Sequence, residues 1–277
     1  IDTTPDEVRL LLVDPKRVEM SNFRGIPHLW TPVVIETEDV VRVLKMVTHE
    51  MDERYKRFAH AGARNLDAYN KRPLDKPLPY LVVIIDELAD LMMVAADEVE
   101  RTICRLAQLA RATGIHLIVA TQRPSVDVVT GLIKANFPTR ISFAVTSQVD
   151  SRTILDQGGA EKLLGRGDML YMSSDSSRPV RLQGSYVADT ELERIVTYWK
   201  GIKGPQYVWE RDQIARWAEA PSASDDPLLE AARKMAQENV RLSPSLLQRR
   251  LHVGFPRAVR LLEMLEEEGL APSGSQA

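Results

Sequence analysis

The 277-residue sequence has almost no cysteine and no long hydrophobic run. Its single cysteine, Cys104, has no partner for an intramolecular disulfide, which excludes a disulfide framework and fits a reducing compartment. Because Cys104 lies among apolar neighbours in a helical pattern, we expect it to be buried. No apolar run approaches the ~20 residues of a membrane-spanning helix, and there is no signal peptide. We therefore expect no membrane contact from this segment.

The sequence also lacks an excess of charge. The 36 Lys and Arg residues nearly balance the 39 Asp and Glu residues, which gives a net charge of -3. The overall charge therefore says nothing about a polyanionic partner, and any nucleic-acid-binding surface must be local. With 44% hydrophobic and 27% charged residues, the chain has the composition of a globular protein with one large core and room for a small second domain.

The clearest functional signal is the run LVVIIDELAD at residues 81–90. Five apolar residues lead straight into Asp86 and Glu87, and such a continuous run suits a strand buried on both faces. Two carboxylates at the end of a buried strand are costly unless they are used. In a nucleotide-hydrolysing protein the first would hold Mg2+ and the second would orient and deprotonate the attacking water. The alternative is a strand that ends in a solvated acidic turn.

Further strands and helices alternate around this run. Residues 9–13 and 115–124 read as buried strands, and 138–146 as a fourth strand nearer an edge, while apolar spacing predicts helices over 38–61 and 98–112. This order predicts an α/β sheet with its active edge at the carboxyl ends of the strands. Four polar side chains fall on that edge: Asp86, Glu87, Thr121 and Gln122.

The rest of the chain predicts a hairpin, a linker and a second domain. Short strands at 168–172 and 180–182 precede a helix at 189–199. Small and polar residues then favour a flexible linker. The resulting division is a first domain at 1–212, a linker at 213–227 and a second domain at 228–277.

The second domain has a helix-turn-helix pattern. We expect helices at about 228–238, 243–251 and 255–268, with a tight turn before the last one. No acidic residue lies between Asn239 and Leu262, so the arginines of this stretch form a local basic patch. Such a patch favours DNA binding over the alternative, a protein-interaction module with a solvated arginine face. The patch contains Arg241, Arg249, Arg250, Arg257 and Arg260.

Several long blocks follow one another along nearly the whole chain. They are VDPKRVE (13–19), GIPHL (25–29), IDELADLMM (85–93), GIHLIVATQRPSVDVVTGLIKANFPTRI (114–141), DSRTILDQGGAEKLLGRGDMLY (150–171) and LLQRRLHVGFPRAVRLLEMLEEEGL (246–270). In these blocks the chain resembles the motor region of the bacterial FtsK/SpoIIIE family of DNA translocases. The resemblance implies a RecA-like P-loop NTPase sheet followed by a small, all-α winged-helix domain. It further implies ATP and Mg2+ as cofactors and a homo-hexameric ring around double-stranded DNA.

The same resemblance implies roles for residues of the motor. Asp86 and Glu87 match the Walker B pair, with Asp86 as the Mg2+ ligand, and Gln122 matches the polar sensor of the γ-phosphate. Arg111 is the best candidate for an arginine finger that reaches a neighbour's nucleotide. A helix C-terminal arginine that complements the helix dipole is the alternative for Arg111.

It also implies which residues contact DNA. Arg123, Lys134 and Arg152 lie in segments that resemble the central-channel loops, whereas Arg140 is either a phosphate or inter-subunit contact or a structural salt bridge. In the tail, Arg260 and Glu263 match base-reading positions, but Pro256 stands where the family often has Asn, which leaves the preferred DNA motif open. Three further tail arginines complete the set: Arg257 shares a helix face with Arg260, and Arg249 and Arg250 are expected to contact phosphate.

Two departures from the family pattern stand out. The phosphate-binding GxxxxGK[ST] loop does not occur in the sequence, and its first strand is missing with it. The chain also stops where the wing hairpin is expected, so both ends look truncated. We therefore expect these 277 residues alone not to hydrolyse ATP at a useful rate.

Three functions are compared. The leading one is a DNA translocase for chromosome segregation in cell division or sporulation, in the bacterial cytoplasm, whose full-length form is anchored in the inner membrane at the septum. Its further partners would be a site-specific recombinase or other division proteins. A conjugative coupling ATPase is disfavoured by the winged-helix tail. A non-catalytic DNA-binding protein is disfavoured by the intact Asp86, Glu87 and Gln122.

Overall fold

The computed structural model of the chain describes two compact units, Ile1–Ala215 and Arg216–Ala277. The described residues are 3–72, 76–176, 178–217, 228–237, 242–251, 253, 258, 261–262, 265 and 270.

A parallel three-stranded sheet forms the centre of the first unit. Its strands are β1 (Val8–Val13), β2 (Tyr80–Ile85) and β3 (Ile115–Val119), in the order β1-β2-β3. Val13 pairs with Ile85 and Ile85 with Val119, so the three strands end in line. The residues that follow the three strands therefore share one edge of the sheet, as the sequence predicts.

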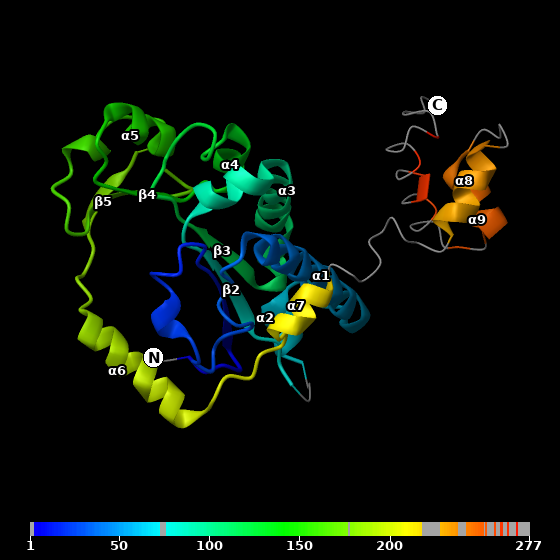
Figure 1. Cartoon of the computed structure of the whole chain (residues 1–277), viewed down its shortest axis with the longest axis horizontal. Helices are drawn as coiled ribbons and strands as arrows, with labels where there is room; N and C mark the ends of the chain where they lie inside the picture. Colours follow the sequence, from blue (N-terminus) through cyan, green and yellow to red (C-terminus); the bar gives the residue numbers. More distant parts are fainter. Residues whose placement is uncertain are drawn as a thin grey trace. The chain divides into compact units, whose positions relative to one another are not determined.

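Helices cover both faces of this sheet. Figure 1 shows α1 (Thr37–Ala61) and α3 (Leu88–Leu109) on one side of β2 and β3, and α6 (Asp189–Ile202) on the other. Leu12 packs with Val196 of α6, while its neighbour Leu11 points to the opposite face and is also fully buried. Burial on both faces explains why β1 and β2 read as continuous apolar runs.

A buried arginine joins the first face to the sheet. Arg54 of α1 donates from Nη1 to the carbonyl oxygens of Pro79 and Thr113, both at 2.8 Å, and pairs with Glu50 at 2.8 Å. Thr113 ends the short helix η2 (Ala110–Thr113), which leads into β3. One side chain thus ties α1 to the entrances of β2 and β3.

A second, antiparallel sheet corrects one expectation. The segment predicted as a fourth strand of the parallel sheet forms β4 (Arg140–Phe143), which pairs with β5 (Asp168–Met172), which in turn pairs with β6 (Val180–Gln183). One face of this sheet packs on α5 (Gln148–Leu155) through Leu155, Ala160 and Met172. The segment was assigned wrongly because its apolar residues cannot reveal which strand they pair with.

The helix after Glu87 begins earlier than the sequence predicts. The apolar spacing indicated a helix over 98–112, whereas α3 starts at Leu88 and ends at Leu109. Glu87 caps it by accepting a hydrogen bond from the amide of Ala89 at 3.2 Å, and the helix is kinked at Ala95 (φ -146°, ψ 53°). Cys104, on the buried side of α3, is only 3% exposed, as predicted.

The expected linker at 213–227 starts with a helix. α7 runs over Arg211–Trp217, and Ile214 within it is buried, so the first five residues of the predicted linker are helical instead. Residues 218–227 lie outside the described part of the chain. The remaining short helices of the first unit are η1 (Ser21–Phe23), α2 (Leu66–Asn70), α4 (Gly131–Asn136) and η3 (Ala160–Lys162).

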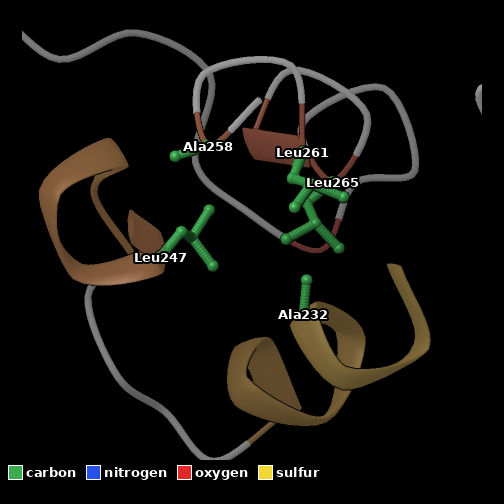
Figure 2. Close-up of a cluster of buried hydrophobic side chains, with 5 residues drawn as sticks. All are labelled: Ala232, Leu247, Ala258, Leu261 and Leu265. Atoms are coloured by element: carbon green, nitrogen blue, oxygen red, sulfur yellow. The ribbon is translucent and has the colours of Figure 1, made fainter. Parts of the chain in front are cut away.

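The second unit is a small helical cluster. Its described helices are α8 (Leu229–Gln237) and α9 (Pro244–Leu251), at the first two predicted positions. Figure 2 shows the side chains that meet in its core: Ala232, Leu247, Ala258, Leu261 and Leu265. Of the third predicted helix, at about 255–268, only residues 258, 261, 262 and 265 are described, and these four are helical. In the part of the chain that the structure describes, no helix has the length and apolar character needed to cross a bilayer.

Candidate nucleotide site and DNA-binding residues

The carboxyl edge of the parallel sheet brings together polar residues from three loops. Asp86 and Glu87 follow β2, and Thr121 and Gln122 follow β3, as the sequence predicts. Two further residues that follow β1, Asp14 and Lys16, join them there. We did not predict these two, because strand register and not sequence spacing brings Asp14 close to Asp86 and Lys16 to Glu87.

Glu87 is enclosed by hydrogen-bond donors. Its side chain is wholly buried, and Lys16 Nζ lies 2.8 Å from Oε2. The hydroxyl of Thr121 donates to Oε1, and the amide of Gln122 lies 3.3 Å from Oε1 and 3.2 Å from Oε2. Burial by itself raises the pKa of Glu87, but the hydrogen bonds from Lys16, Thr121 and the amides outweigh it, so the pKa lies below its usual value. Glu87 is therefore ionised at neutral pH.

Asp86 has the opposite environment. Its Oδ2 is buried and has no hydrogen-bond partner within the protein. Burial raises the pKa of Asp86, and the nearby carboxylates of Asp14 and Glu19 raise it further. Asp14 is fully buried: one of its oxygens accepts from the amide of Met20 at 2.9 Å, and Oδ1 has no partner. Two carboxylates thus present oxygens that a cation would satisfy.

These oxygens fit Mg2+. No group of three or more His, Cys, Asp or Glu side chains within the described ranges could hold a metal by itself. Mg2+ does not require such a cage, because it binds through one or two carboxylates and keeps waters or phosphate oxygens as its other ligands. The orphaned oxygen of Asp86 therefore suits the metal role predicted for it.

Comparisons with known proteins agree with this geometry. Residues 1–126 match the model of the FtsK/SpoIIIE family, and residues 223–276 match the Ftsk gamma domain. The chain belongs to the FtsK/SpoIIIE family.

Among its relatives in the family, the DNA translocase SftA of Bacillus subtilis is 52% identical over 270 residues, which are 96% of this chain and 28% of SftA. The DNA translocase FtsK of Bacillus cereus is 51% identical over 279 residues, 96% of this chain and 35% of that protein. The DNA translocase SpoIIIE of Bacillus subtilis is 49% identical over 276 residues, with the same two shares. The chain thus spans about a third of the length of the curated relatives it matches.

Solved structures show the fold. The pCW3 conjugation coupling protein TcpA, solved with ATPγS, is 26% identical with a TM-score of 0.62, over 72% of this chain and 57% of TcpA. The type VII secretion ATPase EccC of Thermomonospora curvata gives the same TM-score at 23% identity, over 74% of this chain and 26% of EccC. The fold is thus the RecA-like ATPase fold that the sequence predicts.

The arginine-finger candidate lies away from this edge. Arg111 is exposed in η2, which precedes β3, so it sits at the opposite end of the sheet from Glu87. Its backbone carbonyl accepts from the amide of Gly114 at 3.2 Å. Arg111 therefore does not reach the carboxyl edge of its own chain, and its place in the last turn of η2 fits the helix-dipole alternative.

The predicted channel residues differ in their surroundings. Arg123 and Arg152 are exposed, and Arg123 Nη1 lies 3.8 Å from Met93 Sδ. Lys134 instead pairs with Asp156 at 2.7 Å, and Arg140 Nη1 lies 2.7 Å from the same carboxylate. Arg140 also donates to the carbonyl of Ile154 at 2.8 Å, so the structural salt bridge weighed for it is present.

The tail residues are only partly described. Arg249 and Arg250 are exposed in the last turn of α9. Arg257, Arg260 and Glu263, the other predicted DNA contacts, lie outside the described residues.

Proposed function

We propose that this chain is part of an ATP-driven translocase of double-stranded DNA that serves chromosome segregation in cell division or sporulation. The observation that carries the proposal is the pair Asp86–Glu87, held with Gln122 at the carboxyl edge of the sheet. It occurs in a chain about half identical to proteins named DNA translocases. The match of residues 223–276 to the Ftsk gamma domain supports a tail that reads oriented DNA motifs.

The residues of the edge have distinct roles in this proposal. Asp86 would hold Mg2+, with the carboxylate of Asp14 beside it. When bound, the ion would neutralise charge on the phosphates. Glu87 would orient and deprotonate the attacking water, and the exposed amide of Gln122 would sense the terminal phosphate.

In this proposal the phosphate-binding loop comes from outside these 277 residues. β3 pairs with β2, and within the described ranges no strand pairs with its other edge. We place the strand that carries the loop against this edge. Its backbone amides and lysine would supply the cradle for the β- and γ-phosphates that this sequence lacks.

The assembly is proposed from the same family. A homo-hexamer would let Arg111 reach the nucleotide of a neighbouring subunit, and Arg123 and Arg152 would track DNA phosphates in the channel. Other parts of the protein would anchor it in the inner membrane at the septum, where division proteins such as a site-specific recombinase would meet it.

The likeness to TcpA favours a conjugative coupling ATPase as the second candidate. At 26% identity it is far weaker than the 52% shared with SftA, and the match to the Ftsk gamma domain argues for the first. A non-catalytic DNA-binding role would leave the buried carboxylate of Glu87 without a use.

The test is the ATPase rate with and without duplex DNA, on these 277 residues and on the whole protein. We expect hydrolysis only from the whole protein, stimulated by DNA and abolished by Glu87→Gln. The matched control is Glu98→Gln, because Glu98 pairs with Lys45 at 2.5 Å away from the sheet edge. A whole protein that is inert while its tail still binds DNA would replace the motor with a binding role.

A further inference from the structure

Both oxygens of the Glu87 carboxylate accept hydrogen bonds. Oε1 accepts from the hydroxyl of Thr121 and from the amides of Ala89 and Gln122, at 3.2 and 3.3 Å. Oε2 accepts from Lys16 at 2.8 Å and from the amide of Gln122 at 3.2 Å. The side chain has no exposed surface. A general base must be within reach of the water whose proton it takes, so Glu87 is restrained in this arrangement.

Lys16 is the donor that can leave. The two amides are fixed by the start of α3 and the end of β3, and Thr121 is attached to the same backbone. Lys16 instead extends from a loop on a flexible four-carbon stem, and its side chain is 29% exposed. Its ammonium also contacts Oε1 of the exposed Gln122 at 3.3 Å. Lys16 therefore contacts both the buried Glu87 and the exposed Gln122.

The loop that carries Lys16 is itself held in place. Asp14 accepts from the amide of Met20 at 2.9 Å, which closes the loop behind Lys16. Arg17 adopts a left-handed backbone (φ 61°) that is unfavourable for a residue with a side chain, and it pairs with Glu36 at 2.6 Å. The backbone is thus fixed, and only the lysine side chain is free to change its partner.

We propose that Lys16 restrains Glu87 while no triphosphate is bound. When ATP binds, the ammonium of Lys16 leaves Glu87 and forms a hydrogen bond with an oxygen of the terminal phosphate. Glu87 then loses one donor and gains room for the attacking water. Lys16 is a positioning residue for Glu87, and the exchange replaces one hydrogen bond by another without making or breaking a covalent bond. The proposal rests on the proposed function, because that function brings a triphosphate to this edge.

The experiment measures binding and turnover separately in the whole protein. Dissociation constants for ATPγS and for ADP come from titration without turnover, and kcat and KM come from ATPase assays with duplex DNA. Lys16→Met removes the charge, whereas Lys16→Gln removes the charge but keeps a donor for the buried carboxylate. Lys16→Arg keeps both the charge and the hydrogen-bond donor. Lys45→Met is the matched control, since Lys45 also pairs with a glutamate, Glu98, but lies on α1.

The exchange predicts that the Lys16 variants change nucleotide binding much more than kcat. Lys16→Met and Lys16→Gln should reduce the preference for ATPγS over ADP about tenfold, the size expected for one charge-assisted hydrogen bond to phosphate. The KM for ATP should rise by a similar factor while kcat stays within about twofold. Lys16→Arg should keep most of the preference, and Lys45→Met should behave as the unmodified protein.

Other outcomes overturn the proposal. A tenfold fall in kcat with an unchanged ATPγS preference would make Lys16 a structural support of the site. An equal loss in Lys45→Met would remove any special role. If the unmodified protein binds ATPγS but does not hydrolyse ATP, the proposed function fails, and the binding titrations still decide whether Lys16 senses the terminal phosphate.

Discussion

At the scale of single residues, the first unit holds its buried acids by different means. Glu87 is surrounded by donors, whereas Asp86 keeps an unpaired oxygen one residue away. Asp168 in β5 shows a third solution, far from the sheet edge. Its carboxylate accepts from Arg181 at 2.9 and 2.6 Å and from the amide of Leu164 at 2.8 Å. Glu87 is thus satisfied by several donors, Asp86 keeps an oxygen open, and Asp168 is paired with an arginine.

Asp168 gives a pH-dependent stability. The hydrogen bonds from Arg181 and then from Leu164 lower the pKa of Asp168 to about 2. The stabilisation is therefore complete above the usual pKa of 3.8 and is lost as the pH falls from there to about 2. Asp168→Asn should lower the Tm at pH 7, and the difference from the unmodified chain should vanish near pH 2.

Thermal unfolding of both chains between pH 2 and 7 checks this expectation. Asp175→Asn is the control, because Asp175 is exposed in the turn between β5 and β6. A difference in Tm that stays constant down to pH 2 would show that Asp168 acts through its shape and not its charge.

The sequence predicted the site residues that follow their own strand. Asp86, Glu87 and Gln122 were found because a buried apolar run ends directly before polar groups. Asp14 also directly follows an apolar run, but with Pro15 behind it this pattern was interpreted as an ordinary strand end, and Lys16 carries no such signal. Only the parallel pairing of β1 with β2 brings Lys16 to Glu87, 71 positions away. Local sequence patterns thus predict polar residues at the end of a single strand, whereas the pairing of strands decides which residues from other strands lie beside them.

At the scale of elements, the carboxylate of Asp156 connects α5, α4 and β4. Asp156 ends α5 in a left-handed backbone (φ 59°) and pairs with Lys134 of α4 and Arg140 of β4. Asp156→Asn keeps a residue that tolerates this backbone, so it removes only the charge. We expect a loss of about 1 kcal/mol in the free energy of unfolding, because these pairs are partly exposed.

The same variant tests the DNA role of Lys134. Without its carboxylate partner the lysine is available to phosphate, so affinity for duplex DNA should rise about two- to threefold at low salt. Fluorescence anisotropy against Lys134→Gln in the same background checks this. If affinity is unchanged in Asp156→Asn, Lys134 is a structural residue and not a channel contact.

The second sheet has an uncovered apolar face. Ile141 pairs with Tyr171 and Tyr171 with Val180, and Phe143 pairs with Met169 and Met169 with Leu182, so these six side chains share one face. The sequence could not predict this face, because the segment 138–146 was expected in the other sheet. Four of the six are exposed large hydrophobics: Ile141 (50%), Phe143 (56%), Val180 (55%) and Leu182 (40%).

A contiguous face of this kind predicts dye binding and self-association of the 277-residue chain. The double variant Ile141→Thr, Phe143→Thr keeps β propensity and should clearly reduce both. Fluorescence of an apolar dye and size-exclusion chromatography are the measurements. Val208→Thr, an exposed hydrophobic outside this sheet, is the control. Equal dye binding by all three proteins would mean that this face is covered in solution.

At the scale of the whole molecule, the chain divides into a larger unit with the RecA-like fold and a small tail. The family models also match two separate segments, 1–126 and 223–276. The sequence predicted this division from composition, but it placed the linker over residues that α7 includes. A helix of seven residues that follows a polar stretch gives too weak a periodic signal to mark the boundary.

The division predicts that a change in the tail alters DNA binding without altering the motor's stability. Arg249 and Arg250 are exposed at the end of α9, whereas Leu247 on the same helix is fully buried in the core of the tail. As phosphate contacts they would bind all sequences alike. Replacing both by Gln should weaken binding to duplexes of different sequence by the same factor and reduce the salt slope by roughly 2.

Anisotropy titrations with two unrelated duplexes at several salt concentrations measure both quantities. Lys234→Gln, an exposed change in the last turn of α8, is the control, and a thermal melt of the double variant should keep the transition of the first unit. A loss confined to one duplex would instead make these arginines base readers. Because phosphate contacts position a protein and base contacts specify its site, that result would move part of the sequence recognition from the third helix to α9.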